Sequence, residues 1–138
     1  MADAIVRPAL SKHPKLRSKW ICAYSAANHC KDIRNQYAHC HWQSPDGKLH
    51  FLDLDDEAKS HDDQMPVMTV SYRPIDLTLL EKQYQYFEYA VGYMYYVRDQ
   101  LILLTGGQPK GQPYPEPKSI PRPPRDNRRA TVAPSRVR

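Results

Sequence analysis

Two stretches of this chain repeat apolar side chains every three or four residues, and each is bracketed by residues that start or stop helices. The first follows Pro14, which suits the opening turn of a helix because its missing N–H is not needed there. The second ends at Gly106-Gly107, a common helix stop. The spacing therefore predicts a mainly α fold built on two long antiparallel helices, over about residues 14–42 and 76–105.

The second of these helices carries two apolar stripes, and its start matches a capping box at Thr78-Leu79-Leu80-Glu81. A helix with two such stripes is expected to contact more than one neighbour. One stripe is expected to face the first helix, and the tyrosines are expected at the seam of a homodimer. The first stripe comprises Leu80, Tyr84, Phe87, Val91, Met94 or Tyr95, Arg98 and Leu101, and the second comprises Tyr86, Tyr89, Tyr93 and Tyr96 or Val97.

The residues outside the two helices predict smaller elements. Met1–His13 has the pattern of an irregular lead-in, and Ser44-Pro45-Asp46-Gly47 is a strong turn signal. Residues 48–54 and 67–72 are rich in apolar and β-branched side chains, which predicts two short strands forming a β-hairpin inserted at about 48–72.

The positive charge is concentrated in the tail. Residues 106–138 carry eight Lys or Arg and two acidic side chains, a net of +6, whereas residues 1–105 carry a net of −1. With eight prolines and few bulky aliphatic residues, 108–138 is expected to be a disordered Pro/Arg-rich basic tail following a helical domain at 1–107. The tail suits either nucleic acid or a protein partner with an aromatic groove. The candidate nucleic-acid-binding residues are Arg122, Arg125, Arg128 and Arg129.

Other features bound the location and the chemistry. No apolar run approaches the ~20 residues that span a bilayer, and the N-terminus lacks a signal-peptide core, so a cytoplasmic protein without membrane contact is expected. The three cysteines include no CxxC, which favours reduced thiols over disulfides. His29-Cys30 and His39-Cys40-His41 match no established metal-binding spacing, so neither a metal nor a cofactor is expected.

A short motif near the end of the first helix combines an arginine that stays charged with a histidine that titrates near neutrality. It reads Arg34-Asn35-Gln36-Tyr37-Ala38-His39 and is followed by Cys40-His41. Arginine can brace a phosphate while histidine moves a proton, which suits phosphodiester chemistry. On a straight helix Arg34 and His39 would lie about 140° apart, and Arg34 and His41 within about 20°. Either the helix ends or bends near Ala38, or a second subunit contributes, or His41 shares the role.

This stretch resembles the signature of the HEPN superfamily, in which an Arg and a polar residue, often Asn, precede a His by a few positions. Arg34, Asn35 and His39 match the four-spacer form, and His41 satisfies the six-spacer form. The resemblance implies a helical fold in which paired subunits bring their motifs together. Many members are metal-independent endoribonucleases of toxin, defence or RNA-processing systems, and others only bind.

In the mechanism that the resemblance implies, a 2′-hydroxyl of RNA attacks the adjacent phosphorus. His39, with His41 as second choice, would act as general acid or base, and Arg34 would stabilise the phosphate charge. Asn35 would orient either the imidazole or the phosphate. The alternative for the same residues is an Arg and a His that interact with the exposed carbonyls of a helix end. The alternative for the whole chain is a non-catalytic dimeric module that binds protein, such as an antitoxin, or nucleic acid through its basic tail.

Overall fold

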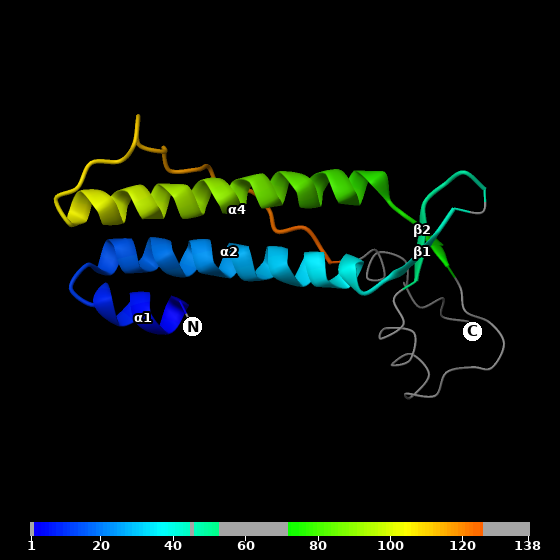
Figure 1. Cartoon of the computed structure of the whole chain (residues 1–138), viewed down its shortest axis with the longest axis horizontal. Coiled ribbons are helices and arrows are strands. Elements are labelled where there is room, and N and C mark those ends of the chain that lie inside the picture. Colours follow the sequence, from blue (N-terminus) through cyan, green and yellow to red (C-terminus); the bar gives the residue numbers. More distant parts are fainter. Residues whose placement is uncertain (1, 45, 53–71, 126–138) are drawn as a thin grey trace, which may run out of the picture. The chain divides into compact units, whose positions relative to one another are not determined.

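The computed structural model describes residues 2–44, 46–52 and 72–125, and the chain divides into two compact units. The first unit comprises residues 1–31 and 83–122, and the second comprises residues 32–82 and 123–138. The described residues form a mainly helical fold with a small antiparallel sheet, as expected (Figure 1). The elements are α1 (Ala2–Ala9), α2 (Pro14–Ala38), β1 (His41–Gln43), β2 (His50–Leu52), β3 (Arg73–Pro74) and α4 (Leu77–Leu104).

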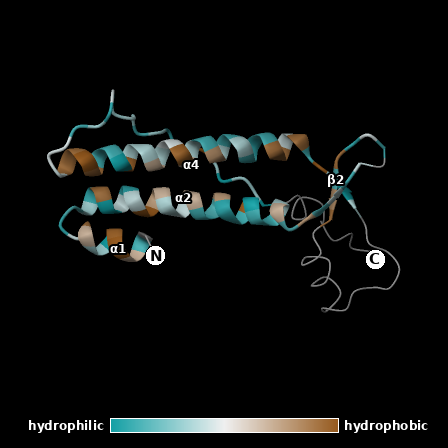
Figure 2. Cartoon of the chain, viewed as in Figure 1, coloured by the Kyte–Doolittle hydropathy of each residue, from teal (hydrophilic) through white to brown (hydrophobic). Residues whose placement is uncertain are grey.

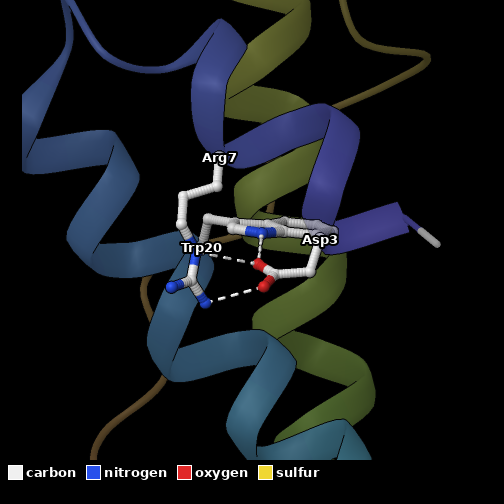
Figure 3. A network of polar contacts seen from close by, with 3 residues as sticks. All are labelled: Asp3, Arg7 and Trp20. Carbon is white, nitrogen blue, oxygen red and sulfur yellow. Dashed lines mark hydrogen bonds and ion pairs between the residues drawn. The ribbon is translucent and has the colours of Figure 1, made fainter.

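The first residues of the chain form helix α1, so the prediction of an irregular lead-in was wrong. Asp3 and Arg7 lie one helical turn apart and form an ion pair of 2.7 Å, a spacing that supports short helices. The same carboxylate accepts a hydrogen bond of 2.9 Å from the indole N–H of Trp20 on α2 (Figure 3). Trp20 is 6% exposed, and its single donor is therefore satisfied where burial makes an unpaired donor costly.

Within the first unit, α2 and α4 run antiparallel, as predicted, and pack through small residues on α2 (Figure 1). Ala23 is fully buried and packs in one cluster with Tyr93 and Val97. Further along α2, Cys30 packs in a second cluster with Tyr86. Small side chains on α2 allow the large aromatic rings of α4 to fill the space between the helices. The alanines of α2, a residue type with high helix propensity, therefore also let this helix pack closely against α4.

The two stripes of α4 have different environments. The stripe of Tyr86, Ala90, Tyr93 and Val97 is buried, whereas Tyr84 and Val91 are 58% and 52% exposed. Figure 2 shows hydrophobic segments alternating with hydrophilic ones along α4. The prediction that the tyrosines of this helix lie at a subunit seam was therefore wrong for Tyr86 and Tyr93, because these rings fill the core of their own chain.

The ends of α4 agree with the predicted bounds to one residue, but its N-terminal cap differs. The Asp76 carboxylate accepts hydrogen bonds from the backbone N–H groups of Thr78 and Leu79, at 2.9 and 3.1 Å, so Asp76 is the cap. At the other end Gly106 adopts φ 77°, and the Gly107 N–H donates to the Ile102 carbonyl at 2.9 Å.

Residues 108–122, which the composition predicted to be disordered, follow α4 as an extended segment that contacts both long helices (Figure 1). The Tyr114 N–H donates to the buried Asp99 carboxylate at 2.9 Å. Further along, Glu116 pairs with Lys19 of α2, and Ile120 packs on the cluster around Tyr86. Proline reduces the entropy that such a segment loses on ordering, so a few contacts suffice to fix it. Residues 126–138 lie outside the described part of the chain.

The second unit holds the three-stranded antiparallel sheet, in the order β1-β2-β3. β1 pairs with β2, with Trp42 opposite Phe51, and Asp46 and Gly47 of the predicted turn lie between the two strands, whereas Pro45 lies outside the described residues. The sequence had assigned β1 to the end of the first helix, and that assignment was wrong because α2 ends at Ala38. A strand at 48–54 is confirmed in its centre by β2. The predicted strand at 67–72 lies outside the described residues except for Tyr72, and β2 instead pairs with Arg73–Pro74.

Candidate functional site

Arg34 and Asn35 lie on the last two turns of α2, within the second unit. Arg34 is exposed, and its Nη1 donates a hydrogen bond of 3.2 Å to Oδ1 of Asn35, which is half-buried. The contact fixes one edge of the planar guanidinium group through a side chain anchored on the same helix. The remaining N–H donors keep the fork geometry that matches phosphate oxygens.

His39 is the first residue after α2 and is exposed. Its backbone N–H still donates to the Asn35 carbonyl at 3.1 Å, so its Cα stays in the helical path although the helix ends at Ala38. The helical relation between Arg34 and His39, about 140° around the axis, is therefore kept, and the helix end alone does not bring the two side chains to one face. Beyond His39, the chain changes direction into β1.

The helix ends here because two side chains that follow it satisfy its last carbonyl groups. The Cys40 thiol donates to the Gln36 carbonyl at 2.8 Å, and the Trp42 indole N–H donates to the Tyr37 carbonyl at 3.2 Å. Carbonyls in the last turn have no partner inside the helix, so these donors replace those that a continued helix would supply. The arrangement holds His39 in a tight connection between a helix and a strand.

His41 is the first residue of β1 and is exposed. The sequence argument placed it on the same helical face as Arg34, and that placement was wrong because the residue belongs to a strand. In the sheet His41 lies opposite Leu52, and its side chain points to the face of the sheet opposite that of Trp42. Of the two histidines, His39 is thus the one that remains joined to the helix carrying Arg34.

Trp42 is a residue of this region that the sequence analysis did not single out. It is 40% exposed, which is unusual for so large an apolar ring, and it lies between His41 and the turn. Its ring packs against Tyr37 and Phe51 at centroid distances of 5.9 and 5.8 Å. The signal that could have identified it was the Pro-Asp-Gly turn between two short aromatic runs, which is typical of a hairpin.

The turn before β2 is held by Asp46. Its carboxylate accepts the Lys48 backbone N–H at 3.1 Å and contacts His50 Nε2 at 2.9 Å, and it precedes Gly47 at φ 74°. The Lys48 N–H first, and then His50, hold the pKa of Asp46 below its ordinary value. The carboxylate therefore stays charged at neutral pH and shapes the turn next to the exposed strand β1.

The tail arginines that the sequence assigned to nucleic acid have partners within the protein. Arg122 donates to the Ser25 hydroxyl at 2.9 Å and to the Tyr86 hydroxyl at 3.4 Å, in the first unit. Arg125 forms an ion pair of 2.7 Å with Asp32 in the second unit. Arg128 and Arg129 lie outside the described residues. The described part of the tail is thus bound to the folded chain rather than extended as a free polycation.

The described residues contain neither a metal-binding cluster nor a membrane-spanning helix. In residues 2–44, 46–52 and 72–125, no three His, Cys, Asp or Glu side chains are grouped so that they could hold a metal ion. No helix in the same ranges combines the length and the apolar character needed to cross a bilayer. Cys30 is buried and its thiol lies 3.9 Å from the Tyr86 carbonyl, whereas the neighbouring His29 packs edge-on against the Tyr86 ring.

Comparison with known proteins adds no relative: no family model, no curated protein and no solved structure matches the chain significantly.

Proposed function

We propose that the junction between α2 and β1 binds RNA and cleaves it without a metal ion, with Arg34 on the phosphate and His39 as the proton carrier. The observation that carries the proposal is the exposed Arg34 guanidinium, fixed by Asn35 one turn before the exposed His39. A fixed planar cation loses less side-chain freedom on binding a phosphate than a free one. The short Arg-Asn-x-x-x-His motif supplies the remaining support.

In the proposed reaction the RNA 2′-oxygen attacks the adjacent phosphorus while His39 accepts the hydroxyl proton. The bond from phosphorus to the 5′-oxygen breaks, and that oxygen takes up a proton from a general acid. We assign this role to His41, the second histidine of the motif. The products are a 2′,3′-cyclic phosphate and a 5′-hydroxyl. Arg34 stabilises the charge that builds on the non-bridging oxygens. No redox partner or co-substrate is needed.

The test is an RNA cleavage assay in EDTA that compares the wild type with the double variant Arg34→Ala/His39→Ala. A matched control is His13→Ala/Arg17→Ala, which removes another exposed Arg and His pair at the start of the same helix. We expect cleavage that persists in EDTA, survives in the control and falls at least ~100-fold in the test variant, since general acid–base catalysis alone contributes about that much. Equal cleavage by both double variants would contradict the proposal.

A second candidate function is a non-catalytic interaction module that binds a protein partner. The exposed apolar residues of α4, which include Tyr84 and Val91, favour it. The held positions of Arg122 and Arg125 weigh against the version in which the basic tail makes the contact. RNA binding without cleavage, lost in Arg34→Ala but not in Arg17→Ala, would assign the module to RNA. Absence of both binding and cleavage would leave a protein partner as the better account.

A further inference from the structure

Four tyrosines of α4 in the first unit form a continuous row of rings. They recur every three or four residues, which places them on one face of the helix. The row comprises Tyr86, Tyr89, Tyr93 and Tyr96, and the centroids of successive rings lie 5.5, 5.6 and 6.2 Å apart. We call it the tyrosine row. Tyrosine combines an apolar ring with a polar hydroxyl group, so each buried or half-buried member needs a hydrogen-bond partner.

Most of these partners come from residues 114–122, which we call the strap and which run back along α4 in the opposite direction (Figure 1). Three hydroxyl groups of the row hydrogen-bond with strap side chains that are three residues apart. The pairs are Tyr96 with Glu116 at 3.4 Å, Tyr89 with Ser119, and Tyr86 with Arg122 at 3.4 Å. The hydroxyl of Tyr93 hydrogen-bonds with Cys22 of α2 instead.

The spacing of these contacts is that of a polyproline II helix, which completes a turn about every three residues. Its three edges carry Glu116, Ser119 and Arg122; Tyr114, Pro117 and Ile120; and Pro115, Lys118 and Pro121. The first edge bonds to the tyrosine row. On the second edge Pro117 and Ile120 are half-buried, and the Tyr114 ring lies 4.9 Å from the Tyr95 ring. The third edge is exposed. The strap therefore lies on α2 and α4 as proline-rich ligands lie on aromatic grooves.

The α2 side of the same site distinguishes the two ends of the strap. Lys19 forms an ion pair with Glu116, and the Ser25 hydroxyl accepts a hydrogen bond of 2.9 Å from Arg122. Lys19, Cys22 and Ser25 recur at three-residue spacing, so they form one edge of α2 beside the row. The site thus accepts an acidic side chain at one end and a basic side chain at the other.

The strap is held by few apolar contacts. None of residues 114–122, all of them described, is fully buried. The link from α4 turns at Gly106 and Gly111, whose φ angles are 77° and 84°. A short link gives a tethered segment an effective concentration of about 1 mM, so even weak contacts keep it bound. A segment of another protein with somewhat better contacts can therefore replace it.

We propose that the tyrosine row binds a proline-rich segment of a partner protein, and that the strap occupies this site until such a segment replaces it. The strap indicates the chemistry of the partner. A fitting segment has an acidic residue and, six positions later, a basic one, as Glu116 and Arg122 are placed. An apolar residue precedes the basic one by two positions, as Ile120 does. This binding goes beyond the RNA chemistry proposed for Arg34 and His39 and does not depend on it.

The test is fluorescence anisotropy of a labelled peptide with the sequence of residues 112–124, titrated with the full chain. Ile120→Asp weakens the strap, because a carboxylate replaces the side chain that packs on the cluster around Tyr86. Lys118→Asp is the matched control, since it adds the same carboxylate on the exposed edge. At an effective concentration of about 1 mM, a strap with a dissociation constant of about 0.1 mM weakens a competitor roughly tenfold. We therefore expect Ile120→Asp to bind the peptide ~10-fold more tightly than the wild type and Lys118→Asp do.

A charge-swapped peptide, with Glu116→Arg and Arg122→Glu, tests specificity at constant composition. We expect Ile120→Asp to bind it at least ~3-fold more weakly, because an arginine then faces Lys19, and exposed charge contacts are individually small. The Ile120→Asp chain lacks an intact strap, so exchange of straps between copies does not interfere. Absence of native-peptide binding to Ile120→Asp at about 1 mM overturns the proposal. Equal affinities of the two chains, or of the two peptides, overturn it as well.

Lys19→Glu keeps the proposal testable if thermal unfolding shows that Ile120→Asp does not fold. The new carboxylate repels Glu116 of the strap and of the native peptide alike. We expect this chain to bind the charge-swapped peptide more tightly than the native one, and the opposite order would contradict the site. The variant Arg34→Ala/His39→Ala should bind the native peptide as the wild type does. No RNA enters these measurements, so their outcome is separate from that of the cleavage assay.

Discussion

The same substitution at two valines of α4 tests directly which face of this helix forms the core. Val97 is 1% exposed and packs with Trp20 and Ala23, whereas Val91 is 52% exposed. Val97→Ala removes the equivalent of two methylene groups, about 1.6 kcal/mol of transfer free energy, and leaves a small cavity that adds about 1 kcal/mol. We therefore expect a loss of about 2–3 kcal/mol in the free energy of unfolding.

Val91→Ala is the matched control on the same helix. It loses about half of the apolar contact area, and the higher helix propensity of alanine offsets part of that, so a change within about 0.5 kcal/mol is expected. For a domain of this size, the core variant should lower the melting temperature by about 10–20 °C and the control by only a few degrees. Far-UV circular dichroism at about 1 µM protein measures both. Equal shifts would refute the assignment of the buried stripe.

Two further predictions concern titratable groups. The pKa of Asp3 lies below its ordinary value of 3.8, first because the Trp20 N–H donates to it, so its contribution to stability is complete above that value and is lost as pH falls through the lowered pKa. Urea midpoints of the wild type and Asp3→Asn should thus differ at pH 7 and begin to converge only as pH falls below about 3.8, and a gap that is the same at pH 7 and at pH 2 would contradict this. Burial raises the pKa of the Cys30 thiol, whereas Cys22 is exposed. Cys22→Ser should remove part of the fast phase of thiol labelling and Cys30→Ser only a slow phase, and equal rates for the two thiols would argue against the packing of α2.

Periodicity predicted the long helices well because they satisfy local and tertiary preferences together. Pro14 and Gly106 mark ends that the backbone itself determines, by the missing N–H of one and the positive φ of the other. Periodicity could not decide which stripe of α4 is buried, because Val91 and Val97 are equally apolar in the sequence. That choice depends on the small residues of α2, such as Ala23, which allow close approach on one side only. Pair packing of this kind is not visible in either helix alone.

Composition failed for the segment after α4 because order there depends on acceptors far away in the sequence. A Pro-rich basic stretch buries little apolar surface, which ordinarily leaves it disordered. Here the buried Asp99 carboxylate accepts the Tyr114 N–H, and the same N–H bond is the largest cause that holds the pKa of Asp99 below its ordinary value. Ile120 adds the one large aliphatic contact of this segment with the cluster around Tyr86. Charge counting could not show that Asp99 faces inward.

The candidate site depends on a boundary that sequence patterns define poorly. A helix continuing to Trp42 would have placed His41 beside Arg34 and His39 on another face. The Cys40 thiol and the Trp42 indole instead cap the last carbonyls of α2, and the chain leaves the helix between the two histidines. Under the proposed function, His39, which stays joined to the helix carrying Arg34, accepts the 2′-hydroxyl proton, and we expect His39→Ala to impair cleavage more than His41→Ala does. Weakening the cap with Trp42→Ala would extend or fray the helix and alter the same chemistry without removing either imidazole.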